Sequence, residues 1–101
     1  MTALFEEKFE QVVKGILASE YDFISPLGPL IIAAAAFGLI EDSRSFARAF
    51  EVEHALVIRE CNSLEKEHSL IKSEMQQQKS QRVYYRLTQT AWSMIPSNIN
   101  E

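Results

Sequence analysis

The sequence holds one cysteine, three glycines and three prolines among its 101 residues. Cys61 alone cannot form an intramolecular disulfide, and two histidines cannot complete a structural zinc site without carboxylate ligands. We therefore expect a metal-free, cytoplasmic protein. Because 47% of the residues are hydrophobic and 24% are charged, the composition excludes a disordered chain, a collagen-like repeat and a linker protein.

Long hydrophobic runs are also missing. The longest, residues 26–40, has about fifteen residues, whereas a membrane span needs about twenty. The first ten residues carry more acid than base, unlike a secretory signal. The length and these absences predict a single domain over residues 1–101, without a membrane segment and with a buried helix in the apolar run.

The sequence also lacks the common motifs of catalysis. It has no glycine-rich phosphate loop, no Gly-x-Ser-x-Gly and no His-Glu-x-x-His. His54 and His68 would lie about 21 Å apart on one helix, too far to share a metal ion. We expect neither an enzyme nor a required cofactor. Cys61 shares a helical stripe with Val57 and Leu64, which favours burial over a redox-sensing role, although a redox-responsive regulator stays a weaker alternative.

Four helices are expected before residue 69. The first, within residues 2–20, is amphipathic, and its apolar stripe either packs on the body or pairs with a second copy; we favour neither. A second helix is expected to start at Pro29, with Gly28 as its cap, and to end near Leu39. Residues 42–45 cap a short third helix that ends near Phe50, and a fourth follows over residues 53–67. Helix, short turn, helix is typical of a helix-turn-helix.

Beyond Ser69 the apolar period changes from 3.6 to 2. Residues 70–75 and 82–87 form two strand-like runs around a polar tract, which predicts a β-hairpin. Thr88 is expected to cap a last short helix. The fold class is therefore α+β and mainly α.

The fourth helix carries the row of residues that bears on function. Ala55, Arg59, Asn62 and Lys66 fall opposite Val57. Arginine can bond guanine and asparagine can bond adenine, so this row suits base recognition in a major groove. An ordinary solvated face would be the simpler interpretation of one helix alone. Glu53 and Glu60 are expected to pair with Arg44 or Arg48.

The charge distribution favours a nucleic-acid partner more than the net charge of −4 does. Residues 1–41 hold two cations against six acids, whereas residues 42–92 hold eight cations against seven acids. Residues 72–86, the predicted hairpin, hold four cations and one acid. The cations are concentrated where a hairpin could meet a phosphate backbone.

These segments together resemble a winged helix-turn-helix domain of the MarR-like transcriptional regulators. Residues 42–52 are similar to the family's second winged-helix segment, residues 54–67 to its recognition helix with the ending Leu-Glu-Lys-Glu, and residues 70–72 and 84–88 to its wing strands. The resemblance covers about residues 25–92. Glu51 stands where the family often has a glycine in a left-handed turn. The C-terminus is short, with no long helix expected after Trp92, so the family's usual dimer helices are only half present.

The resemblance implies a winged helix-turn-helix over residues 25–95 that binds double-stranded DNA, with helix 53–67 in the major groove and wing 72–86 on the backbone. It implies base contacts from Ala55, Arg59 and Asn62 and phosphate contacts from Ser43, Lys79 and Arg82. The full set predicted to contact DNA is Ser43, Arg44, Ala55, Ile58, Arg59, Asn62, Ser63, Lys66, Lys79, Gln81 and Arg82. A homodimer through the N-terminal helix is expected.

A second hypothesis is an adaptor, a winged helix that presents its surface to another protein instead of DNA. The overall acidity and the glutamates of the fourth helix favour it. One continuous positive face across Arg59, Lys66, Lys79 and Arg82 would support DNA binding, whereas interleaved acids would support the adaptor. The sequence does not indicate an operator or a small-molecule effector.

Overall fold

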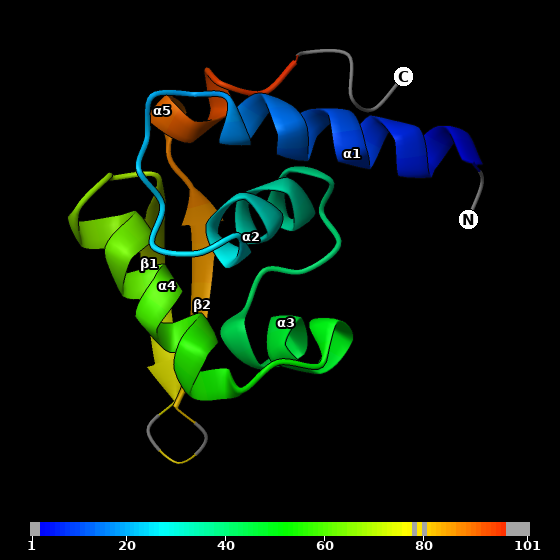
Figure 1. Ribbon diagram of the computed structural model, residues 1–101. Helices are drawn as coiled ribbons and strands as arrows, with labels where there is room; N and C mark the ends of the chain where they lie inside the picture. Colours follow the sequence, from blue (N-terminus) through cyan, green and yellow to red (C-terminus); the bar gives the residue numbers. More distant parts are fainter. Residues whose placement is uncertain (1–2, 78, 80, 97–101) are drawn as a thin grey trace.

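A computed structural model describes residues 3–77, 79 and 81–96 of the chain. Within them the elements follow in the order α1 (Ala3–Leu17), α2 (Leu27–Ala36), α3 (Ser43–Phe50), α4 (His54–Lys66), β1 (Ile71–Gln77), β2 (Arg82–Leu87) and α5 (Gln89–Trp92) (Figure 1). They form a compact body of 38 × 29 × 21 Å. The prediction of a mainly helical α+β domain with one hairpin is confirmed.

Helix α1 lies across one end of the body, above α2 (Figure 1). Its stripe residues Val12 and Ile16 are buried in the core, and the ring of Phe9 lies 5.7 Å from that of Phe37 at the end of α2. Leu17, the last residue of α1, is 54% exposed. Packing within one chain therefore accounts for most of the apolar stripe.

Helix α2 is the central helix, and its residues from Ile31 to Ala36 are buried. The predicted start at Pro29 is wrong, because the helix already begins at Leu27 after Pro26. Pro29 is then the third helical residue, where a backbone N–H would have no partner inside the helix, so the proline costs little. The helix also ends earlier than predicted, before Gly38, whose φ of 71° turns the chain away.

Helices α3 and α4 follow one another across the short turn of residues 51–53. Asp42 caps α3 by accepting a hydrogen bond of 2.9 Å from the Ser45 backbone N–H. Glu51 ends α3 in the left-handed conformation, with φ 54° and ψ 47°, and the next N–H, that of Val52, donates back to Ala47 O at 3.0 Å. The turn is thus the left-handed one that glycine favours, here built with a glutamate.

Strands β1 and β2 pair antiparallel, with Ile71 opposite Leu87 and a bulge between Ser73 and Met75. The other edge of β2 is also occupied, because Asp42 bridges to Tyr84 and the Tyr85 N–H donates to Glu41 O at 3.1 Å. Glu41 and Asp42, just before α3, therefore form a short extended segment along the second edge of β2.

Two glycines make a matched test of the packing between α2 and α4. A Cβ on Gly28 would lie 2.8 Å from Glu60 Oε2 and 2.8 Å from Phe23 Cδ1, whereas a Cβ on Gly15 would meet nothing within 4 Å. We expect Gly28→Ala to destabilise the fold by about 1–3 kcal/mol through overpacking. Gly15→Ala should stabilise helix α1 by about 0.5–1 kcal/mol. Urea denaturation of both variants measures the change, and shifts of the same sign would contradict the packing described.

Candidate nucleic-acid interface

Helix α4 is held in place by the buried side chains of its inward face and by the carboxylate of Glu65. Val57, Cys61 and Leu64 are buried, as predicted from their spacing. Burial raises the pKa of the Cys61 thiol to about 12, so the thiol stays protonated at neutral pH. Near the C-terminal end of the helix, the Glu65 carboxylate accepts hydrogen bonds from Ser73 N at 3.0 Å and Ser73 Oγ at 2.7 Å. These bonds lower the pKa of Glu65 and tie α4 to the bulge of β1.

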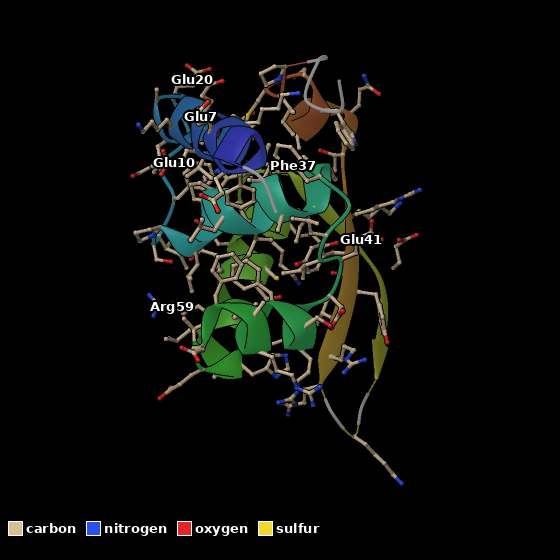
Figure 2. All side chains as sticks on the ribbon, turned by 90° about the vertical axis from the view of Figure 1, so that its right-hand side faces the viewer. Glu7, Glu10, Glu20, Phe37, Glu41 and Arg59 are labelled. Atoms are coloured by element: carbon tan, nitrogen blue, oxygen red, sulfur yellow. The ribbon has the colours of Figure 1, made fainter. Side chains whose placement is uncertain are left out.

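The outward face of α4 carries the predicted row. Ala55, Arg59, Asn62 and Lys66 are all exposed, and Ile58 beside them is half-buried. Figure 2 shows the Arg59 side chain directed away from the body. The row therefore presents two cations, an amide and a small residue to solvent along one helix.

Two serines of the predicted set are buried, which corrects the expectation that their side chains meet DNA. Ser43 Oγ accepts a hydrogen bond of 2.9 Å from Val83 N and shares one of 2.8 Å with His54 Nε2, so it joins α3, α4 and β2. Ser63 lies on the packed side of α4 next to Leu64. Helical spacing does not reveal that Ser43 is covered by a strand forty residues later.

His54 marks the start of α4 and lies close to cations of the predicted interface. Its burial lowers its pKa, as do the positive charges of Arg44 and Arg82, while Asp42 acts in the opposite direction. Arg44, another residue of the predicted set, is half-buried. The imidazole is therefore disposed to stay neutral and to keep its bond to Ser43.

The hairpin offers less free charge than the sequence suggested. Lys79 and Gln81 are exposed, but Arg82 is held by the fold, with Nε 3.4 Å from Asp42 Oδ2 and Nη1 donating to Tyr84 Oη at 3.3 Å. On the exposed flank of the sheet, Arg86 Nε lies 3.9 Å from Glu74 Oε2. Two of the three guanidinium nitrogens of Arg82 are thus engaged within the protein.

The two halves of the predicted site lie apart. In Figure 2, Arg59 is at one edge of the molecule and the hairpin is at the opposite edge. In Figure 1, the start of α4 lies at the same end of the molecule as the end of β1 and the start of β2, opposite α1. A duplex that touches both would have to cross this end, where α3 meets α4.

Glu60 is the feature of α4 that sequence reasoning misplaced. The expected pairing of Glu60 with Arg44 or Arg48 is wrong, because the carboxyl is 1% exposed and accepts a hydrogen bond of 2.5 Å from Ser25 Oγ at Oε1. Its position three residues after Val57 and one before Cys61 was the available signal for burial. Burial raises its pKa, although the Ser25 bonds and the Arg59 and His68 charges oppose this.

The raised pKa of Glu60 predicts that the stability of the fold depends on pH. The folded protein binds the Glu60 proton more tightly than the unfolded chain, so this residue's contribution to stability is largest below its ordinary pKa of 4.5. The contribution is lost as the pH rises through the folded-state pKa. We expect the melting temperature of the wild type to fall relative to that of Glu60→Gln as the pH rises from about 4 to 7. A difference that stays constant with pH would contradict the shift.

Within residues 3–77, 79 and 81–96, no group of three or more His, Cys, Asp or Glu is placed to hold a metal ion. Over the same part of the chain, none of the helices combines the length and the apolar character that crossing a membrane requires. Comparison with protein-family models, with curated proteins and with solved structures finds no match for this chain.

Proposed function

We propose that the protein binds double-stranded DNA through a winged helix-turn-helix and acts as a cytoplasmic transcriptional regulator. The observation that carries the proposal is the outward row of α4, where Ala55, Arg59, Asn62 and Lys66 are exposed on the second of two helices joined by a short turn. Arginine and asparagine are the side chains that read guanine and adenine edges bidentately. A small residue near the start of the helix permits close approach to the bases.

The hairpin supports the same proposal. It follows α4 directly, and the bridge from Asp42 to Tyr84 fixes the start of α3 to β2. The helix-turn-helix and the hairpin are therefore coupled as one unit, which lets the hairpin tip act as a wing. Exposed Lys79 at the tip would contact phosphate, and Gln81 would assist it.

The proposed interface omits the two buried serines. Its base-reading members are Ala55, Arg59 and Asn62 on α4, with Ile58 and Lys66 at their sides. Its phosphate-binding members are Arg44, Lys79, Gln81 and, after release from Asp42, Arg82. A homodimer with one α4 per half-site would read a pseudo-palindrome.

Selection of duplexes from a random pool by the purified chain, followed by mobility-shift titration, tests the proposal. We expect an enriched motif, and an affinity for it that exceeds the affinity for unselected DNA and falls with increasing salt. The net charge of −4 makes weak non-specific binding the expected background. Failure to retard any duplex at low salt by a chain that circular dichroism shows to be folded would overturn the proposal.

A protein-binding adaptor is the second candidate, and a specific observation favours it. Exposed acids flank the cations of α4, with Glu51 and Glu53 in the turn before the helix and Glu67 just after it. Leu56 on α4 is also 44% exposed. Interleaved acids repel phosphate and suit a protein surface. The selection experiment separates the two functions, because an adaptor enriches no DNA motif.

A further inference from the structure

One buried serine hydroxyl connects α3, α4 and β2. Ser43 is 0% exposed, and its Oγ accepts the Val83 N–H at 2.9 Å and lies 2.8 Å from Nε2 of His54. Among the residues that the structure describes, the Ser43 side chain has no other hydrogen-bond partner. Helix α3 lies beside β2 (Figure 2), so this hydroxyl helps to hold the hairpin against the two helices.

The hydrogen bonds of Ser43 are complete only when the imidazole of His54 is neutral. The hydroxyl has one proton to donate, while its oxygen already accepts the Val83 N–H. A neutral His54 with its ring proton on Nδ1 offers Nε2 as the acceptor for that hydroxyl. A protonated imidazole presents a second N–H donor instead. The hydroxyl proton is then buried without an acceptor, which costs free energy.

The charges around His54 also disfavour its protonation. Burial of the ring lowers the pKa of His54 from its ordinary value of 6.5, and the positive charges of Arg44 in α3 and Arg82 in β2 lower it further. Asp42 opposes them, but it is already paired with Arg82, with Oδ2 3.4 Å from Nε. Glu53, the preceding residue in the chain, is exposed. The ring itself is only half-buried, so a proton from solvent can reach it.

We propose that Ser43 and His54 form a proton-sensitive latch, which holds β2 against α3 and the start of α4 at neutral pH and loosens in mild acid. The folded protein binds the His54 proton less tightly than the unfolded chain does. The stability that the latch contributes is therefore present above pH 6.5 and is lost as the pH falls through the folded-state pKa. The latch is part of the fold and does not depend on DNA binding.

NMR of the full-length protein from about pH 8 to about pH 5 tests the proposal. The Cε1–H shift of His54 reports protonation of the ring, and hydrogen exchange of the Val83 amide, corrected for the intrinsic effect of pH, reports its bond to Ser43. We expect the ring to titrate below pH 6.5, and the protection of the Val83 amide to fall at least about fivefold across that titration. The Thr88 N–H, which donates to Leu70 O within the hairpin, should keep its protection. A ring that titrates at or above pH 6.5, a ring that stays neutral to about pH 5, or constant protection of Val83 would each overturn the proposal.

Variants assign the pH response to the latch. His54→Gln supplies a neutral acceptor that does not titrate, so the protection of the Val83 amide should no longer depend on pH. His68→Gln removes the other histidine of the chain and is the matched control, which should respond like the wild type. Ser43→Ala removes the hydroxyl and should leave the Val83 amide weakly protected at every pH. If Ser43→Ala fails to fold, His54→Gln still decides, because a wild-type pH response in that variant would refute the latch.

Discussion

Replacement of Arg59 with alanine should weaken binding to a selected duplex about 5- to 150-fold, the equivalent of 1–3 kcal/mol for a bidentate base contact. The side chain is exposed and points away from the body, so its loss should leave the fold intact. Specificity should relax at the base pair that Arg59 reads. Mobility-shift titration against the selected duplex and a scrambled one measures both effects.

Two lysine variants are compared with Arg59→Ala. Lys79→Ala removes an exposed cation at the hairpin tip and should weaken binding to both duplexes alike, with a smaller salt dependence. Lys14→Ala removes the same charge from α1, at the end of the molecule opposite the start of α4, and should change little. If Arg59→Ala behaves like Lys14→Ala, α4 is not the base-reading element.

Replacement of Phe46 with alanine should cost about 3–5 kcal/mol of unfolding free energy. The side chain is 0% exposed, and its ring stacks on Phe50 with 4.3 Å between centroids. Domains of this size are stable by only about 5–15 kcal/mol, so the loss should lower the melting temperature by about 12–40 °C. Urea denaturation followed by circular dichroism measures the free energy directly.

Leu17→Ala is the control for Phe46→Ala. It also shortens an apolar side chain, but Leu17 is 54% exposed at the end of α1, so the cost should stay below about 1 kcal/mol. Because Phe46 lies in α3, its loss should also reduce DNA binding in proportion to the unfolded fraction. Similar costs for Phe46→Ala and Leu17→Ala would show that α3 does not pack as described.

Several features followed from the sequence by itself. The 3.6-residue spacing of Val57, Cys61 and Leu64 identified the buried face of α4, and hence the exposed row opposite it. The cap residues Asp42 and Thr88 marked the starts of α3 and α5, because a short acceptor side chain reaches N–H groups only two or three residues away. The period of two beyond Ser69 identified both strands. These are local signals, and each depends on residues close together in the chain.

Only the tertiary structure decided which polar side chains are available for binding. Ser43 is hydrogen-bonded to Val83, Arg82 is ion-paired with Asp42, and Glu60 is hydrogen-bonded to Ser25. The two residues of each pair are 35 or more positions apart in the sequence. The spacing of one element indicates which face it buries but not which distant group will meet a polar side chain there. The packing of β2 and of the segment before α2 makes these contacts. The sequence determined the exposed face of the helix that we propose to read DNA, and the fold determined which of the neighbouring polar side chains remain available to bind beside it.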